Sequence, residues 1–472
     1  MALSVSLGLL LFRIECIGLG PDPDTDAYGH YVIGRQLLDT PLNLRIHWVW
    51  LPLFHGLLAA GISVGASLEH VRLANAVISA LTPLLLFALP LGIRSPSPPL
   101  DRGVIALAAL LAATTPIAIQ MGTTAQPEAL FGVLFIGAAV TLARQHHAAA
   151  AALLSAAVLT RYEAWVAVAS VAVILVLPWL RTRKRPALGL LACVAAPAVT
   201  IACWVTARWL GGEPFLGFLS DNQRFAESAL RATVTRRIDA AFIAHHLLQP
   251  TTLACLSLAA CAALGLPRAL RSHGVWVVAL PGSVIGFLGL GWLTRSHLGL
   301  ERHWVAASPF VALWMAHGVA RAGELCGKAH GRAVAPAFAS LSLLVGSLSL
   351  STLTERLSEW QSATARALLE RRAAAHFLRS VPGDALIVCD EASVEVLSEL
   401  PRQRFMRTFI NDAAAPRLLA LASKRDVYVL SWRTRMSQVM QLGRVVYSRE
   451  ENGGDALVAV HLALPASARA LD

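Results

Sequence analysis

Two aspartates separated by one residue follow the first apolar segment of the chain. Asp24 and Asp26 lie in the sequence PDPDTDAY, just before Tyr28. Two carboxylates at this spacing can share a cation, or one of them can act as a general base. Asp is also a favoured helix N-cap, so the same residues can simply begin a helix near Asp26. The local sequence leaves both interpretations open.

Two further charged clusters stand beside apolar runs. Glu128 opens one run in the sequence QPEALF, where an acid near a helix N-terminus is also structurally favourable. Arg161, Tyr162 and Glu163 lie between two short apolar runs, in LTRYEAW. The arginine and the glutamate can pair with each other, as intramembrane charges usually do. Alternatively, the planar guanidinium can bind a lipid phosphate through two hydrogen bonds.

The last cluster, Arg302 with His303, precedes a later apolar run. Arginine, histidine and tryptophan are common anchors at a membrane interface, which is the structural interpretation of this cluster. The functional interpretation is a second contact to a phosphate or to an acceptor.

The composition indicates the class of protein that must position these groups. Of the 472 residues, 56% are hydrophobic and 15% are charged, and the mean hydropathy is +0.59. Soluble proteins carry about 25% charged residues, so the chain is predicted to be a polytopic α-helical membrane protein. The formal charge of +11 is explained by basic cytoplasmic loops. No nucleic-acid-binding motif accompanies it, so nucleic acid is not an expected partner.

Hydropathy predicts about eleven transmembrane helices, the first within residues 1–20. The others are expected near 71–93, 103–121, 127–143, 147–160, 162–180, 187–210, 250–266, 275–294, 304–320 and 333–353. A span needs about 20 apolar residues, so the runs 147–160 and 162–180 are short. They predict a hairpin whose turn, Thr160–Glu163, dips into the membrane.

Loop charges predict the orientation. One set of loops is rich in basic residues, namely Arg94, Arg102, Arg144, Arg181, Arg183, Lys184, Arg185, Arg268, Arg271, Arg321, Lys328 and Arg332. Basic loops remain in the cytoplasm. The loop 21–70, the loop 211–249 and the C-terminal tail are therefore expected outside, together with all four charged clusters. A bacterial inner membrane with a site facing the periplasm fits this arrangement.

The domain organisation follows from a change in composition. Residues 1–353 form the predicted transmembrane domain, in which the loop 21–70 carries amphipathic helices. Residues 354–472 form a small extracytoplasmic α/β module. Its predicted strands are ALIVCDE, FMRTFI, DVYVLSW, RVVYSREE and ALVAVHLAL, and its predicted helices are SVEVLSEL and APRLLALASK.

The order of these parts resembles the GT-C superfamily of membrane glycosyltransferases, which includes protein mannosyltransferases and the aminoarabinose transferase of lipid A. The resemblance is carried by the D-x-D motif after the first span, by QPEALF, by LTRYEAW and by the polar C-terminal module. DTDAY departs from the D-E dipeptide of the protein mannosyltransferases, which argues against that branch.

The resemblance implies transfer of a sugar, mannose or a similar hexose or pentose, from a polyprenyl-phosphate donor, with inversion. The acceptor would be a lipid, a glycan or a protein on the outer face. Asp24 or Asp26 would act as the base, and Arg161, with Arg302 or a divalent cation, would stabilise the leaving phosphate. The remaining contacts to donor or substrate would come from Tyr28, Glu128, Tyr162, Glu163 and His303. The cofactor stays undetermined, with Asp24 and Asp26 as the expected ligands of any cation.

Two alternatives come from other classes. One is a transporter or flippase for a lipid-linked sugar, although such proteins often show repeated halves that this sequence lacks. The other is a non-catalytic scaffold of an envelope complex, docked through the C-terminal module. A scaffold has no need of Asp24 and Asp26, so these two residues discriminate between the alternatives.

Overall fold

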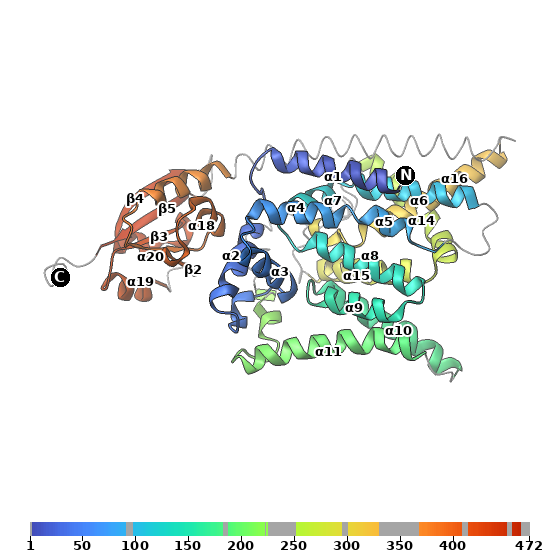
Figure 1. Cartoon of the computed structure of the whole chain (residues 1–472), viewed down its shortest axis with the longest axis horizontal. Coiled ribbons are helices and arrows are strands. Elements are labelled where there is room, and N and C mark those ends of the chain that lie inside the picture. Colours follow the sequence, from blue (N-terminus) through green and yellow to red (C-terminus); the bar gives the residue numbers. More distant parts are fainter. Residues whose placement is uncertain are drawn as a thin grey trace. The chain divides into compact units, whose positions relative to one another are not determined.

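The computed structural model describes residues 2–90, 98–182, 187–221, 223–224, 252–294, 301–329, 368–407, 414–450 and 456–463. The chain divides into two compact units (Figure 1). The first comprises Met1–Asp22 and Ile33–Ser358, and the second comprises Pro23–Val32 and Glu359–Asp472.

The first unit is built of helices that follow the predicted apolar runs. They are α1 (Ala2–Gly18), α4 (Leu68–Ser79), α5 (Thr82–Phe87), α6 (Pro98–Thr114), α7 (Pro116–Thr123), α8 (Glu128–Ala143), α9 (His147–Val158), α10 (Glu163–Thr182), α11 (Leu188–Leu210), α14 (Thr252–His273), α15 (Trp276–Leu293) and α16 (Ser308–Ala329). The predicted run at 333–353 lies outside the described residues. The helical character predicted from hydropathy is therefore confirmed.

The number of spans differs from the expectation. In the described part of the chain, three helices are long and apolar enough to cross a membrane: Leu68–Phe87, Glu163–Thr182 and Leu188–Leu210. The pair Arg102–Thr114 and Ile117–Thr123, bent by 60°, can count as a fourth. Several other apolar helices have 10–17 residues, fewer than the about 20 that a crossing needs. The count of eleven is therefore not confirmed, because hydropathy marks apolar runs but not the bends within them.

The expected hairpin is present as a pair of helices. α9 has 12 residues and α10 has 20, and the turn between them spans residues 159–162. The Thr160 hydroxyl donates a hydrogen bond to the carbonyl of Ala156, near the end of α9. The turn is held from outside the hairpin as well, because the amide of Leu53 donates to the carbonyl of Leu159 at 3.0 Å.

The polar stretch after α1 forms short helices, as predicted. They are α2 (Thr25–Asp39), the 3₁₀ helix η1 (Leu44–His47) and α3 (Pro52–Ser63). Pro52 stands in the first turn of α3, where its missing N–H removes no hydrogen bond. The Tyr162 hydroxyl donates to the carbonyl of Val49 at 2.9 Å, so the segment between η1 and α3 contacts the hairpin turn.

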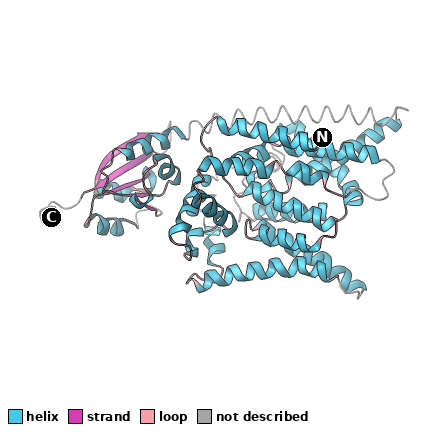
Figure 2. Ribbon diagram, viewed as in Figure 1, coloured by secondary structure: helices cyan, strands magenta, loops and turns pink. Residues whose placement is uncertain are grey.

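The second unit contains a five-stranded sheet, the magenta element of Figure 2. Its order is β2-β1-β3-β5-β4, formed by β1 (Leu386–Cys389), β2 (Phe405–Arg407), β3 (Val427–Trp432), β4 (Arg444–Glu450) and β5 (Ala456–Leu462). β1 pairs in parallel with β2 and β3, whereas β5 pairs antiparallel with β3 and β4. All five predicted strands are found, although residues 408–410 of FMRTFI lie outside the described residues.

The helices of this unit connect the strands. They are α18 (Ala392–Ser398), α19 (Ala415–Ala422) and α20 (Ser437–Leu442), with the 3₁₀ turns η3 (Arg402–Arg404) and η5 (Arg433–Arg435). α18 and α19 match the predicted helices. Parallel neighbours need such crossover connections, whereas β4 and β5 are consecutive and can pair directly. The prediction of a small α/β module is therefore confirmed.

Candidate active site

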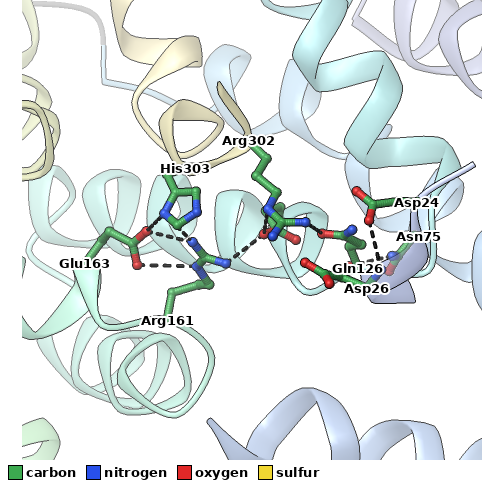
Figure 3. A network of polar contacts seen from close by, with 9 residues as sticks. Asp24, Asp26, Asn75, Gln126, Arg161, Glu163, Arg302 and His303 are labelled. Carbon is green, nitrogen blue, oxygen red and sulfur yellow. Dashed lines mark hydrogen bonds and ion pairs between the residues drawn. The ribbon is translucent and has the colours of Figure 1, made fainter. Parts of the chain in front are cut away.

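Arg161 is the centre of a polar cluster in the first unit (Figure 3). Its Nη1 donates to Glu128 Oε1 at 2.7 Å, and its Nη2 donates to Glu163 Oε1 at 2.8 Å. A third bond, from Nε to Glu163 Oε2 at 3.3 Å, makes the contact with Glu163 bidentate. Burial alone would lower the pKa of Arg161, but the two carboxylates outweigh it and raise that pKa above its usual value. The guanidinium therefore stays charged.

His303 joins Arg161 to Glu163 through one ring nitrogen. His303 Nδ1 lies 2.9 Å from Arg161 Nη2 and 3.2 Å from Glu163 Oε1. A neutral ring with its proton on Nε2 accepts from Arg161, whereas a protonated ring donates from Nδ1 to Glu163. The preferred partner of His303 thus depends on its protonation state.

Arg302 extends the cluster toward the start of α8. Its Nη1 donates to Gln126 Oε1 at 3.1 Å, and its Nε lies 3.8 Å from Glu128 Oε1. Glu128 consequently stands between two guanidinium groups. No local pattern predicts the contact between Arg302 and Gln126, because the two residues are 176 positions apart.

Three element boundaries bring these side chains together. Glu128 is the first residue of α8, Glu163 is the first residue of α10, and η2 (Glu301–Trp304) precedes α16. A carboxylate in the first turn of a helix is stabilised by the positive end of the helix dipole. The expected capping role of Glu128 and its contact with Arg161 are therefore compatible.

The loop before α8 is fixed by residues that sequence analysis did not single out. Asn75 of α4 donates to the carbonyls of Thr124 and Gln126, both at 2.7 Å. One turn earlier in α4, Arg72 donates to Thr123 at 2.8 Å and lies 3.8 Å from Asp22. The signal was present, since two strongly polar residues at i and i+3 lie on one face of a helix.

The positive and negative side chains of the cluster differ in how much of their surface is exposed. The carboxylate side chains of Glu128 and Glu163 are 2% and 4% exposed. Arg161, His303 and Arg302 are 13%, 15% and 18% exposed. A buried ion pair is weak evidence for stability, because desolvation offsets the attraction between the charges. The positive side chains of the cluster are therefore more accessible than its carboxylates.

Asp24, Asp26 and Tyr28 belong to the second unit. The amide of Asp26 donates to Asp24 Oδ1 at 3.0 Å, and α2 begins at Thr25. The capping interpretation of Asp24 is therefore correct. Capping engages one carboxylate oxygen of Asp24, so the role of a base remains a prediction for both residues.

The loop 21–70 contains His30, His47, His55 and His70, which share it with Asp24 and Asp26 and could bind a metal ion, but in the described residues they form no metal site. His47 Nδ1 lies 2.7 Å from His55 Nδ1, too close for both nitrogens to bind one ion, and His70 caps α4 through Ser67. Where the chain is described, no three His, Cys, Asp or Glu side chains form a group that can hold a metal ion. Asp24 and Asp26 remain the pair that the sequence offers to a divalent cation.

Arg144, one of the basic loop residues, lies at the opposite end of α8 from Glu128. Arg144, just after α8, donates to the carbonyl of Ala88 at 2.6 Å, and His273 at the end of α14 contacts the carbonyl of Pro90. Sixteen residues of α8 separate Arg144 from Glu128, or about 24 Å at 1.5 Å per residue. Glu128 and Arg144 therefore lie at opposite ends of α8, and the orientation of these ends in the membrane remains a prediction.

The comparisons with known proteins concern the fold. No protein-family model matches the sequence, and no curated protein matches it. Among solved structures, ArnT from Cupriavidus metallidurans bound to undecaprenyl phosphate superposes with a TM-score of 0.60 at 13% identity, covering 98% of both chains. The chain has the ArnT fold.

Two other solved structures also match the chain. ArnT in its apo state matches with a TM-score of 0.58 at 12% identity, again over 98% of both chains. The archaeal oligosaccharyltransferase AglB from Archaeoglobus fulgidus, in complex with an inhibitory peptide and a dolichol-phosphate, gives a TM-score of 0.45 at 12% identity, covering 97% of this chain and 74% of that one. The likeness to ArnT concerns the fold, and it agrees with the helical domain and polar C-terminal module that the order of motifs predicted.

Proposed function

We propose that this protein is an integral-membrane glycosyltransferase that moves one sugar from a polyprenyl-phosphate carrier to an acceptor on the extracytoplasmic face. The observation that carries the proposal is the Arg161 cluster, in which two arginines and a histidine gather around two buried carboxylates and are somewhat more exposed than they are. The ArnT structure that shares this fold is bound to undecaprenyl phosphate, a ligand with the same chemistry.

In the proposed reaction an acceptor hydroxyl attacks the anomeric carbon of the donor sugar. The bond between that carbon and the phosphate oxygen breaks, and polyprenyl phosphate leaves with the electron pair. Asp24 or Asp26 takes the hydroxyl proton as general base. Attack opposite the leaving group inverts the anomeric centre.

Arg161 and Arg302 stabilise the charge that grows on the leaving phosphate. Glu128 and Glu163 hold the Arg161 fork in a fixed orientation, so no reorganisation is needed at the moment of reaction. His303 can accept from Arg161 when neutral and donate to Glu163 when protonated, so its hydrogen bond can change as charge develops on the phosphate. Tyr28 and Tyr162 complete the proposed set of substrate contacts, and a divalent cation at Asp24 and Asp26 would add to the charge stabilisation.

The test is incubation of membranes containing the protein with labelled polyprenyl-phosphate sugars. Transfer of label to an endogenous acceptor is expected for the wild type and should be abolished by Asp24→Asn or by Asp26→Asn. Asp39→Asn, at the end of α2, serves as a matched control. Full activity of both single variants and of the double variant would remove the base assignment. A flippase would instead move the labelled lipid across the membrane without any loss of label from the carrier.

A further inference from the structure

A second polar pocket lies beyond the C-terminal end of α11, within the first unit. Its volume is about 300 Å³, at the lower end of the range for small-molecule sites. The charged and aromatic side chains that line it are Arg45, Trp48, Arg208, Glu213, Asp221 and Arg224. None of them belongs to the Arg161 cluster.

Glu213, which lines this pocket, has one carboxylate oxygen without a hydrogen-bond partner among the described residues. Its Oε2 accepts from Arg208 Nε at 2.8 Å and lies 2.6 Å from Arg208 Nη2. Its Oε1 is buried and has no hydrogen-bond partner within the described part of the chain. A buried polar atom without a partner costs about 1–3 kcal/mol. A ligand that brings an O–H or N–H group to this oxygen would remove that cost.

Arg208 fixes the position of Glu213. Its side chain is 3% exposed, and its Nη1 donates to the carbonyl of Trp48 at 2.7 Å. The guanidinium carbon lies 4.8 Å from the ring centre of Phe218 and 5.5 Å from that of Trp204. Because Nε, Nη1 and Nη2 each have a partner and two aromatic rings lie beside the guanidinium, Arg208 holds the Glu213 carboxylate in a defined place.

Trp48 supplies an aromatic surface at the pocket. It is held at φ 50°, a left-handed conformation that bulky residues rarely adopt. Such strain costs of order 1–3 kcal/mol and persists only where the surroundings impose it. Here the bonds are from the Trp48 amide to Arg45 and from Arg208 to the Trp48 carbonyl. The strained backbone leaves the indole 42% exposed.

We propose that this pocket binds a sugar ring of the acceptor. A hydroxyl would donate to Glu213 Oε1, other hydroxyls would accept from Arg45 and Arg224, and the C–H face of the ring would pack on Trp48. Only a ligand with donors, acceptors and an apolar face satisfies all three. The lining also holds three arginines, with Arg208 paired to Glu213 and Arg224 to Asp221, so a phosphate is the competing ligand that the experiment must exclude.

Two stacked aromatic rings, Tyr162 and Phe218, lie between the pocket and the Arg161 cluster. Tyr162, next to Arg161, lies 5.9 Å from Phe218 between ring centres, with an angle of 13° between the planes. The guanidinium of Arg208 lies over the ring of Phe218 in a cation–π contact. A sugar held in this pocket would therefore be one aromatic layer from the cluster. Its assignment to the acceptor rests on the proposed transferase function.

Direct binding tests the pocket without requiring activity. The full-length protein in lipid nanodiscs is mixed with methyl hexosides and methyl hexosaminides, and saturation-transfer NMR reports bound sugar. Wild type should bind at least one of them. Trp48→Ala and Glu213→Gln should each weaken binding about tenfold or more, the latter because an amide N–H₂ replaces the acceptor. Trp209→Ala, an exposed tryptophan of α11 outside the pocket, should bind as wild type does.

Three results would overturn the pocket: no sugar bound by wild type, equal binding by the Trp48 and Glu213 variants, or displacement of the sugar by inorganic phosphate. Arg161→Lys separates the pocket from the reaction. It should bind sugar normally while losing transfer. If the wild type transfers no label while the pocket variants lose sugar binding, the transferase proposal fails and the pocket stands. If Arg161→Lys loses transfer while the pocket variants bind sugar normally, the pocket fails and the transferase proposal stands.

Discussion

Arg161 and Arg208 are both buried arginines paired with glutamate, yet their surroundings differ in one respect. Arg161 has two carboxylates and a histidine as partners. Arg208 has one carboxylate, a backbone carbonyl and two aromatic faces, and its glutamate keeps one oxygen without a partner. A cluster that is nearly balanced in charge can orient a cation for a reaction. A pair with an unused acceptor can bind a ligand.

The largest expected effect is at Arg161. Removing a preorganised donor to a developing charge typically costs about 10²–10³ in rate. Arg161→Lys keeps the charge but loses the planar fork, so sugar transfer should fall by about 10²-fold while the protein stays folded. Steady-state kinetics with a labelled polyprenyl-phosphate sugar measures this loss. Transfer within a factor of two of wild type would contradict a phosphate role for Arg161.

Arg208 is expected to act on stability more than on chemistry. Arg208→Met leaves Glu213 as an uncompensated buried charge, which should lower the free energy of unfolding by about 3–5 kcal/mol. The double variant Arg208→Met with Glu213→Met removes both charges and should recover much of that loss. Thermal unfolding in nanodiscs measures both. A double variant as unstable as the single one would show that the aromatic contacts, and not the ion pair, set the stability.

The two carboxylates of the Arg161 cluster should differ in effect. Glu163 contacts the guanidinium through two hydrogen bonds and also contacts His303, whereas Glu128 makes one hydrogen bond to it. Glu163→Gln should therefore reduce kcat more than Glu128→Gln, by about tenfold against a few-fold, since each charge-assisted bond contributes roughly 1.5–3 kcal/mol gross. Equal losses in kinetic assays would mean that orientation of Arg161 is not what the glutamates provide.

The last prediction is a pH dependence of the free energy of unfolding, caused by His47, which precedes the pocket residue Trp48 in the chain. Burial and the neighbouring Arg208 lower the pKa of His47 to about 4. The unfolded chain, with a His pKa near 6.5, therefore binds more protons between about pH 6.5 and 4, and stability falls as the pH drops through that window. The loss is on the order of 3 kcal/mol at most. Unfolding temperatures from pH 7 to 4.5 should fall less in His47→Gln than in wild type, and parallel curves would contradict the assignment.

The sequence alone determined the class of protein, the positions of most helices and the five strands of the C-terminal unit. These follow from local physics: apolar runs bury as helices in a membrane protein, and short β-branched runs between turn residues form strands. It also singled out Glu128, Arg161, Glu163, Arg302 and His303, since a charge at the mouth of an apolar run needs a reason.

Only the tertiary structure decided which of these groups meet. The distance between Arg161 and His303, or between Arg302 and Gln126, depends on how helices far apart in the chain pack, and no local pattern encodes it. The same holds for Asn75 and Arg72, which fix the loop before α8, and for Glu213, whose unused oxygen exists only because Arg208 occupies the other. Partners satisfied across 30 to 180 residues are set by three-dimensional packing, because a hydrogen bond acts through space and not along the chain.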